Sequence, residues 1–510
     1  MINTSGNNND YFQIKVDNNK KKNINSVEIF LKNIYSYYYK HGYWNIIIEQ
    51  IVDIVGLIFT LIFSIIIFMF LDWGNILKCS MKKQQCNNII NNETWKLNGF
   101  YMAFVSTYIA IISLILIGNL YKFYNSIKKF NQVNKFYRDI LKLKDDELNC
   151  TDWKYIVERL VKNQLYFNNE INLNASKILN LIMRKENYLI ALIESDIFPL
   201  KIGNNIILTK MMEWIIYNSI INTVCDINFF SGTNNSRKIE NILSKRFKLT
   251  GVLCLIISPF LLIFMFIYII LIYGNKYHTK SSESYRQWNK YALCKFREYN
   301  ELPHLFEERI SRSIKYSHNY ILSFNTSYSS RILQLISFMV SAMLVTILTL
   351  GFLNEDLMTV HLGNRALAWY AIFLGIILTV VKLFDFDVYI SKPKSMIIGR
   401  IKEFTRYVPE SWEENPKSYN THKEFITWFQ PTIIIYIIEL LSVIILPILL
   451  LLKYKNFVKD ITYFIIKNTV YSHDDGIFVK MSVIDKNQIT NSDQKMERSI
   501  LGFNNYYNRL

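Results

Sequence analysis

The amino-acid sequence predicts an all-α polytopic membrane protein. Six long apolar runs contribute to a hydrophobic fraction of 51% over 510 residues. Each run is close to the ~20 apolar residues that a helix needs to cross a bilayer, and a helix satisfies its backbone hydrogen bonds inside lipid. The whole chain carries a net charge of +17, most of it in the polar stretches outside the runs. Beside membrane segments, this charge favours contact with anionic lipids over nucleic acid.

The chain begins with a polar segment, residues 1–25, which we expect to be cytosolic and disordered because it contains few large apolar side chains. The first apolar run is too long for a signal peptide and is interpreted as a signal anchor. From Ser26 onward, Ile29, Phe30, Ile34 and Tyr38 give an amphipathic helix an aromatic-rich face. Aromatic rings just before a span are typical of a membrane interface.

Spans are predicted at residues 46–71 and 100–121, followed by a cytosolic helical block over residues 122–250. The second helix should continue past the membrane, because apolar residues keep helical spacing as far as Leu141. In the loop between the two spans, Asn92 is a candidate for glycosylation, although a sequon in so asparagine-rich a chain can arise by chance. Cys79 and Cys86 of the same loop are candidates for a disulfide.

Two later apolar runs contain proline: Pro259 lies within residues 251–273 and Pro447 within residues 432–452. Lys and Arg are frequent in loops 274–330 and 384–430, whereas loop 354–366 contains only Arg365. The positive-inside rule therefore places the first two loops in the cytosol and the third outside. This arrangement requires both proline-containing runs to enter and leave the membrane on the same side.

The resulting topology has four spans and two re-entrant helices, with both termini cytosolic. Residues 26–452 form the membrane core and residues 453–510 a short cytosolic tail. The third and fourth spans are predicted at residues 332–353 and 367–383. Re-entrant segments are tolerated where protein or a watery cavity covers their freed backbone groups.

Residues 295–310, KFREYNELPHLFEERI, are strongly charged although apolar runs lie on both sides. Leu302, Leu305, Phe306 and Ile310 recur at helical spacing. We expect a cytosolic helix pair bent at Pro303, which packs the first re-entrant run against the spans.

Several motifs in order resemble the autophagy-related protein 9 family over about residues 26–485. Residues 295–310 are similar to the family's FREFNE-x-x-HLF run. Residues 182–192, 244–247 with 258–260, 407–412 with 422–430, and 439–442 with Pro447 are similar to other family segments. The family residues in the first motif are Arg297, Glu298, Asn300, Glu301, His304 and Phe306.

The chain departs from the family pattern at two places. Gly476 is followed by Ile477 and Phe478, where the family usually has a cysteine. The long cytosolic tail of many members is almost missing, which puts tail-dependent partner contacts in doubt and leaves the membrane core unaffected.

The resemblance implies a homotrimer with four spanning and two re-entrant helices per protomer. It also implies energy-independent phospholipid scrambling in vesicles that seed the autophagosome. The implied partners are phospholipids, further copies of the chain and a bridge-like lipid-transfer protein. The implied location is autophagosome precursor vesicles and Golgi or endosomal membranes.

A scramblase needs a polar path for headgroups through the hydrocarbon, because a charge at the bilayer centre costs at least about 2.5–3.5 kcal/mol. Candidate path residues are Lys280, Glu283 and Arg286 after the first re-entrant run, with Thr379 and Lys382 at the end of the fourth span. The alternative is that the cations extend to lipid phosphates at the boundary. The acids Asp53 and Glu439 either line the path or accept hydrogen bonds from a neighbouring helix.

No catalytic motif, metal-ligand spacing or cofactor fingerprint is found in the sequence, so neither an enzyme nor a metal site is predicted. His304 is interpreted as a packed or capping histidine, since no ligand partner lies at suitable spacing. Two functions compete with scrambling: a membrane scaffold that recruits autophagy factors, and a channel or secondary transporter with a midplane site in broken helices.

Overall fold

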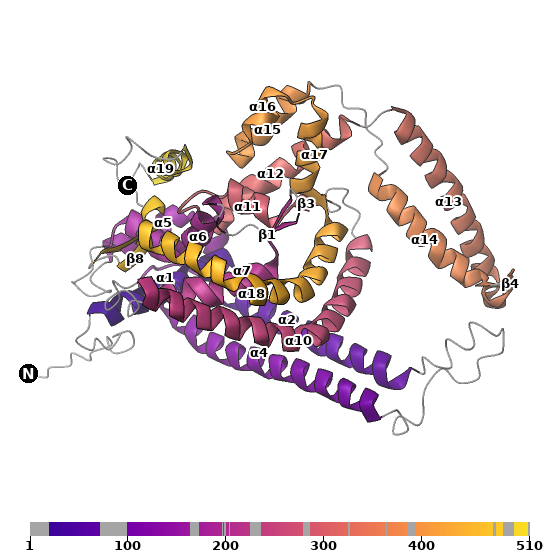
Figure 1. The fold of residues 1–510 in the computed structure, drawn as a ribbon, viewed down its shortest axis with the longest axis horizontal. Coiled ribbons are helices and arrows are strands. Elements are labelled where there is room, and N and C mark those ends of the chain that lie inside the picture. The colour runs from indigo at the N-terminus through magenta and orange to yellow at the C-terminus, as the bar shows by residue number, and fades with distance from the viewer. Residues whose placement is uncertain are drawn as a thin grey trace, which may run out of the picture.

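The computed structural model describes residues 20–71, 99–163, 173–195, 197, 200–202, 205–224, 236–278, 286–324, 327–363, 365–384, 393–472, 476–482 and 494–507. These residues form a mostly helical structure with four short antiparallel strand pairs. Figure 1 shows a helical body from which one helical hairpin stands apart. The all-α prediction is therefore confirmed at the level of fold class.

The body contains a helical block built around three buried apolar clusters. Its amphipathic helices turn one apolar stripe inward and leave charged residues outside. The helices that lie wholly within this block are α1 (Lys20–Tyr39), α5 (Trp153–Lys162), α6 (Ala175–Glu194), α7 (Lys210–Ile216), α8 (Asn222–Val224), α11 (Lys290–Phe296), α12 (Pro303–Leu322), α15 (Lys394–Thr405), α16 (Glu410–Glu414), α17 (Tyr419–Trp428) and α19 (Gln494–Tyr507).

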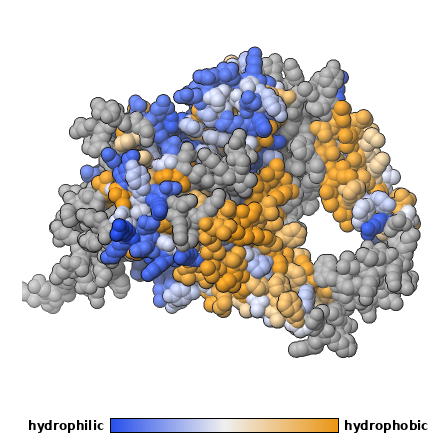
Figure 2. All heavy atoms as spheres, viewed as in Figure 1, coloured by the Kyte–Doolittle hydropathy of each residue, from blue (hydrophilic) through white to orange (hydrophobic). Residues whose placement is uncertain are grey.

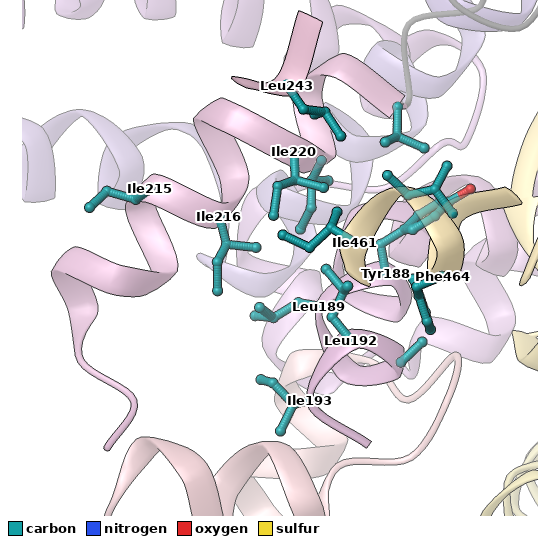
Figure 3. Close-up of a cluster of buried hydrophobic side chains, with 14 of the residues drawn as sticks. Tyr188, Leu189, Leu192, Ile193, Ile215, Ile216, Ile220, Leu243, Ile461 and Phe464 are labelled. Carbon is teal, nitrogen blue, oxygen red and sulfur yellow. The ribbon is translucent and has the colours of Figure 1, made fainter. Parts of the chain in front are cut away.

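Each apolar cluster joins different helices. The first cluster, in Figure 3, gathers Leu189 and Leu192 of α6 with Ile216 of α7 and with Ile461 and Phe464. The second joins α1, α5 and α6, and the third joins α11, α12, α15 and α17. Since each cluster draws on helices far apart in sequence, the block is stabilised mainly by tertiary packing.

A first apolar hairpin consists of α2 (Tyr43–Ile65), continued by the π-helical turn η1 (Ile66–Phe70), and α4 (Gly99–Asp139). The Tyr108 hydroxyl donates to Ser64 Oγ across the pair at 3.0 Å, and the Tyr101 hydroxyl donates to the Phe68 carbonyl at 2.7 Å. Polar groups thus find partners between the helices, as burial in hydrocarbon requires. The predicted continuation of the second helix past its apolar run is present, since α4 extends to Asp139.

A second apolar hairpin consists of α13 (Ser327–Leu353) and α14 (Leu367–Phe384), which pack on each other. Its tip contains the 3₁₀ turn η7 (Glu355–Thr359) and the strands β4 (His361–Leu362) and β5 (Arg365–Ala366). Figure 1 shows this hairpin separated from the rest of the body. None of the described side chains in residues 331–353 is buried in the single chain.

The two proline-containing runs form the long helices α10 (Ser236–His278) and α18 (Thr432–Asn468). They pack along each other, and both bend in Figure 1. Pro259 and Pro447 lie inside them, and proline removes a backbone donor and kinks a helix. Both helices extend well beyond the apolar runs, because their polar ends join the helical block.

Five helices in the described residues are long and apolar enough to cross a membrane: Tyr43–Phe70, Gly99–Asp139, Ser236–Ile269, Arg331–Leu353 and Thr432–Leu452. The apolar stretch Leu367–Leu378 is shorter. In Figure 2, hydrophobic side chains cover the α10 and α18 face and the separate hairpin, while hydrophilic ones cover the block. This division is that of a multi-pass membrane protein.

Some expected boundaries differ from the structure. Helix α1 begins at Lys20 and so includes residues expected to be disordered. Its side chains Ile34 and Tyr35 are buried in the second cluster instead of facing a membrane interface, although Trp44 is exposed. Residues 453–510 continue α18 and add β7 (Thr469–Ser472), β8 (Gly476–Val479), η8 (Lys480–Ser482) and α19.

The remaining short elements are η3 (Asp145–Cys150), η5 (Tyr217–Ile221), β1 (Leu200–Ile202), β2 (Asn205–Ile207), β3 (Arg286–Trp288) and β6 (Phe429–Pro431). The pair β3–β6 is the one that positions the candidate site. It joins a segment following α10 to the residues immediately before α18.

Candidate functional site

The strand pair β3–β6 brings together two segments more than a hundred residues apart in sequence. Arg286 lies opposite Pro431 and Trp288 opposite Phe429. The Trp288 ring is buried and its Nε1 donates to Ser313 Oγ of α12 at 3.0 Å. The start of α18 is thereby attached to α11 and α12.

Asn289 reinforces the same attachment through three hydrogen bonds. Its Oδ1 caps α11 by accepting from the Ala292 amide at 2.8 Å, and its Nδ2 donates to the Thr427 carbonyl at 2.8 Å. Its backbone amide donates to the Trp428 carbonyl at 2.8 Å. An asparagine suits this position because its amide both caps a helix and reaches a second backbone.

Arg286 is a buried cation, with 8% of its surface exposed. Its Nη1 donates to the Phe429 carbonyl at 3.4 Å. Burial lowers the pKa of the Arg286 guanidinium, because a low dielectric disfavours the charged form. A guanidinium stays charged in proteins, so this position retains a positive charge.

Arg286 belongs to a basic cluster, which we define as Arg286, Lys394 and His422. Burial lowers the pKa of His422, and the charges of Lys394 and Arg286 lower it further. The His422 ring stacks on Phe324 with centroids 4.1 Å apart, and Lys394 Nζ lies 3.2 Å from the Phe324 ring centroid. Within the described residues, none of the three cluster members forms an ion pair with a carboxylate.

The basic cluster lies where the membrane elements meet the block. Phe324 comes just before α13, Lys394 begins α15 shortly after α14, and β6 leads directly into α18. Uncompensated cations at such a place can bind the phosphate of a lipid headgroup or another anion.

The predicted motif residues lie in the link between α11 and α12 and in the first turn of α12. Asn300 has a left-handed backbone with φ 59°, which asparagine adopts more readily than most residues. Its backbone amide donates to Asn187 Oδ1 at 2.9 Å, and Asn187 Nδ2 donates to Asn300 Oδ1 at 2.8 Å. The two buried asparagines satisfy each other and fix the turn.

The motif acids form a dense ion-pair network. Glu301 accepts from Arg309 through both carboxylate oxygens, at 2.9 and 2.8 Å. Glu298 is 2% exposed and pairs with Arg406 at 3.1 Å and Arg498 at 3.3 Å. Burial nevertheless raises the pKa of Glu298, against the pull of the arginines.

Arg297 and Phe306 connect the link to its surroundings. Arg297 pairs with Glu186 of α6 at 2.9 Å, and its guanidinium lies 5.6 Å from the Phe306 ring centroid. Phe306 and Ile310 belong to the third apolar cluster, whereas Leu302 belongs to the second. The apolar stripe is thus divided between two clusters, and Pro303 begins a helix instead of bending one.

His304 contacts α1. Its Nδ1 lies 2.9 Å from the Tyr35 hydroxyl, and its backbone amide donates to the same hydroxyl at 3.3 Å. Burial lowers the pKa of His304 to about 4, so the ring is neutral near pH 7. Among the residues that the structure describes, no group of three or more His, Cys, Asp or Glu is arranged to hold a metal ion.

The two predicted intramembrane acids have different surroundings. Glu439 of α18 is buried, and its carboxylate oxygens accept from the Lys210 amide at the start of α7 at 2.9 and 3.0 Å. A carboxylate there also interacts favourably with the helix dipole. Asp53 of α2 is exposed on the surface of the single chain.

Several predicted site residues lie outside the described residues. These are Lys280 and Glu283 of the candidate path, the candidate glycosylation site Asn92, and the candidate disulfide residues Cys79 and Cys86. Thr379 and Lys382 lie on α14, and their side chains are outside the description. Arg286 is the path candidate with a described environment.

Sequence reasoning missed Lys394 and His422 as neighbours of Arg286, and Asn187 as the partner of Asn300. Asn187 lies within residues 182–192, a segment similar to the family, and its neighbours on the buried face of α6 are mostly apolar. A buried amide in such a face needs a partner, and this was the available signal. Nothing in the spacing of Lys394 and His422 points to Arg286.

Comparisons with known proteins agree with this architecture. The family described as "Autophagy protein ATG9" matches residues 19–485. Autophagy-related protein 9 of Dictyostelium discoideum is 27% identical over 459 residues, covering 88% of this chain and 65% of the relative. The Arabidopsis thaliana protein of the same name is 26% identical, covering 95% of this chain and 61% of the relative.

A cryo-EM structure of Schizosaccharomyces pombe Atg9 has a similar fold, with a TM-score of 0.65 and 23% identity. The similarity covers 91% of this chain and all (100%) of that one. The chain spans about half to two thirds of the length of the first curated relatives, with 65%, 61% and 49% of them covered. Because the family match extends over most of the sequence, this chain belongs to the autophagy protein ATG9 family.

Proposed function

We propose that this protein is an energy-independent phospholipid scramblase that moves lipids between the leaflets of vesicles and of the growing autophagosome membrane. The observation that carries this proposal is the basic cluster, in which Arg286 is buried, Lys394 and His422 are half-buried, and no member pairs with a carboxylate within the described residues. A phosphate passing between leaflets needs such polar partners, because an unsolvated charge in hydrocarbon is costly. The protein needs no cofactor for this activity and performs no covalent chemistry.

Four spanning and two re-entrant helices give the topology that we propose. The first half of α10 and the end of α18 are buried in the same apolar cluster, through Leu243 and Ile461 for example. The β3–β6 pair ties the region after α10 to the start of α18. Both ends of each proline-containing apolar run therefore return to one helical block, which supports re-entrance from the cytosolic side.

The two hairpins are the proposed spans. Helix α2 starts at the block and α4 ends in it, as shown by buried Ile46 and Phe136. Helix α13 follows α12, and α14 is followed by α15. The far ends of both hairpins then lie on the opposite side of the membrane, and both termini lie in the cytosol.

The assembled protein is proposed to be a homotrimer on autophagosome precursor vesicles and on Golgi or endosomal membranes. A bridge-like lipid-transfer protein that fills one leaflet is the proposed partner, because scrambling would rebalance its product. The proposal is supported by family membership and by the bare apolar surface of the α13–α14 hairpin.

The test is leaflet exchange of fluorescent phospholipids in vesicles containing the purified protein. Arg286→Met removes the charge and keeps much of the volume. A lost charged hydrogen bond is worth about 1.5–3 kcal/mol, so exchange should slow by about tenfold or more. Arg400→Met is the matched control, because Arg400 is exposed and pairs with exposed Glu403.

Equal exchange rates for the wild type and Arg286→Met would remove the basic cluster from the lipid path. If the wild-type protein gives neither lipid exchange nor ion flux, the scaffold alternative is favoured. Ion flux without lipid exchange would instead indicate a channel or transporter.

A further inference from the structure

Helix α19 lies beyond residue 485, where the match to the family ends, yet it docks on the family motif. Lys495 Nζ pairs with Glu194 Oε2 at 3.0 Å, and Arg498 Nε pairs with Glu298 Oε1 at 3.3 Å. Ser499 Oγ accepts from the Tyr299 amide at 3.0 Å. Three polar side chains of α19 thus bind two acidic side chains and one backbone amide.

Lys495 is deeply buried for a lysine, with 5% of its surface exposed. Besides Glu194, its ammonium group donates to the carbonyls of Cys294 and Lys295 at 3.2 Å each. An ammonium group has three donors, and all three are used. A buried lysine with three acceptors specifies both the position and the register of the helix.

The buried apolar residues of α19 lie on the side of the helix that contacts the block. Met496, Ile500 and Tyr507 are buried, and Tyr507 packs in the second cluster with Leu302. The opposite face is solvent-exposed at Glu497, and Leu501 is 54% exposed. This spacing is that of an amphipathic helix lying in a groove.

The groove, which we call the α19 groove, is formed by Glu194, Glu298, Tyr299, Leu302 and Arg406. A cavity of about 360 Å³ remains beside the helix, lined by Glu298, Arg406 and Phe503 among others. A Cβ at Gly502 would lie 3.0 Å from Arg406 Nη1. Glycine there leaves room for Arg406 to reach Glu298 under the docked helix.

We propose that the α19 groove is a recognition site for a basic amphipathic helix, and that α19 is its releasable intramolecular occupant. A 14-residue helix is marginal in water by itself, so its folding should be coupled to docking. Two of its main contacts are ion pairs, and the partly exposed pair at Arg498 is the one that salt weakens more. Release removes one of the two arginines on Glu298 and frees the Tyr299 amide beside the left-handed turn at Asn300.

The experiment uses the full chain with a protease site inserted between Ser482 and Gln494. After cleavage and a wash at high salt, a fluorescent synthetic peptide of residues 491–510 is titrated at low salt and followed by anisotropy. The wild-type peptide should bind saturably. A peptide with Lys495→Ala and Arg498→Ala should bind at least about tenfold more weakly, whereas Glu497→Ala should match the wild type.

Absence of peptide binding, or equal binding of the double variant, would overturn the proposal. Hydrogen exchange on the uncut protein gives an independent test should cleavage cause aggregation. In Lys495→Ala, amides of residues 494–507 should exchange about tenfold faster, with those of α6 and α12 unchanged. Unchanged protection of α19 would contradict the proposal, as would an equal loss of protection throughout the block.

Discussion

Two pairs of helices contain long apolar runs but differ in how they pack against the helical block. The pairs are α10 with α18 and α13 with α14. The ends of α10 and α18 are buried in the helical block or tied to it by β3–β6. The α13–α14 hairpin packs on itself, and the described side chains of α13 are not buried. Apolar composition determines which segments can enter lipid, whereas the flanking residues determine where they return.

The largest expected effect concerns the sidedness of α10. Single cysteines are placed at Lys245 before its apolar run, at Lys315 on α12 after it, and at Glu355 at the hairpin tip, in a background without native cysteines. All three positions are exposed. In sealed, oriented vesicles, an impermeant maleimide should label the first two from one side and the third only from the other. Labelling of Lys245→Cys and Lys315→Cys from opposite sides would mean that α10 crosses the membrane.

A second experiment compares how much one aromatic ring in each region contributes to the free energy of unfolding. Trp288→Ala removes a ring that is 4% exposed at the β3–β6 junction, and large-to-small core changes of this kind cost about 3–5 kcal/mol. Phe352→Ala removes a ring that is 92% exposed at the end of α13, so its cost should be within about 0.5 kcal/mol. Thermal unfolding in detergent measures both. Similar losses of stability would show that the hairpin is as well packed as the junction.

A smaller effect is expected from acidification, which should act on the block and leave the hairpin unaffected. Burial lowers the pKa of His304 from 6.5 to about 4, so between these values the unfolded chain binds more protons than the folded one. The free energy of unfolding should therefore fall as the pH drops from about 6.5 to about 4. The loss is on the order of 2 kcal/mol once partial exposure is allowed for.

His304→Gln is the matched variant, because it keeps a polar side chain that does not titrate. Its stability should vary less with pH in this window than that of the wild type. Identical pH profiles for the two proteins would show that another group controls the acid response.

The sequence predicted the motif at residues 295–310 but only part of its structure. The helical spacing of Phe306 and Ile310 is present in α12, and both residues share a cluster. Leu302 departs from the stripe because the turn at Asn300 sends it to the second cluster. Periodicity assumes a continuous helix, and the link between α11 and α12 breaks that assumption.

The candidate site shows the same division. Arg286 was predicted from its position after an apolar run, which a single sequence can reveal. Its neighbours Lys394 and His422 come from α15 and α17, and no local pattern connects these segments. The ion pairs of Glu298 with Arg406 and Arg498 likewise join residues that are 108 and 200 positions apart in the sequence.

The sequence by itself determined the all-α class, the approximate limits of the apolar helices and the family. In lipid, the backbone N–H and C=O groups must form their hydrogen bonds within each helix. The length of an apolar run and the position of a proline in it therefore predict the helix from the local sequence alone. The tertiary structure decided which helix ends share a cluster, which cations surround Arg286 and which carboxylates hold α19. Those choices depend on packing and charge pairing between distant segments, and only the folded chain brings these segments together.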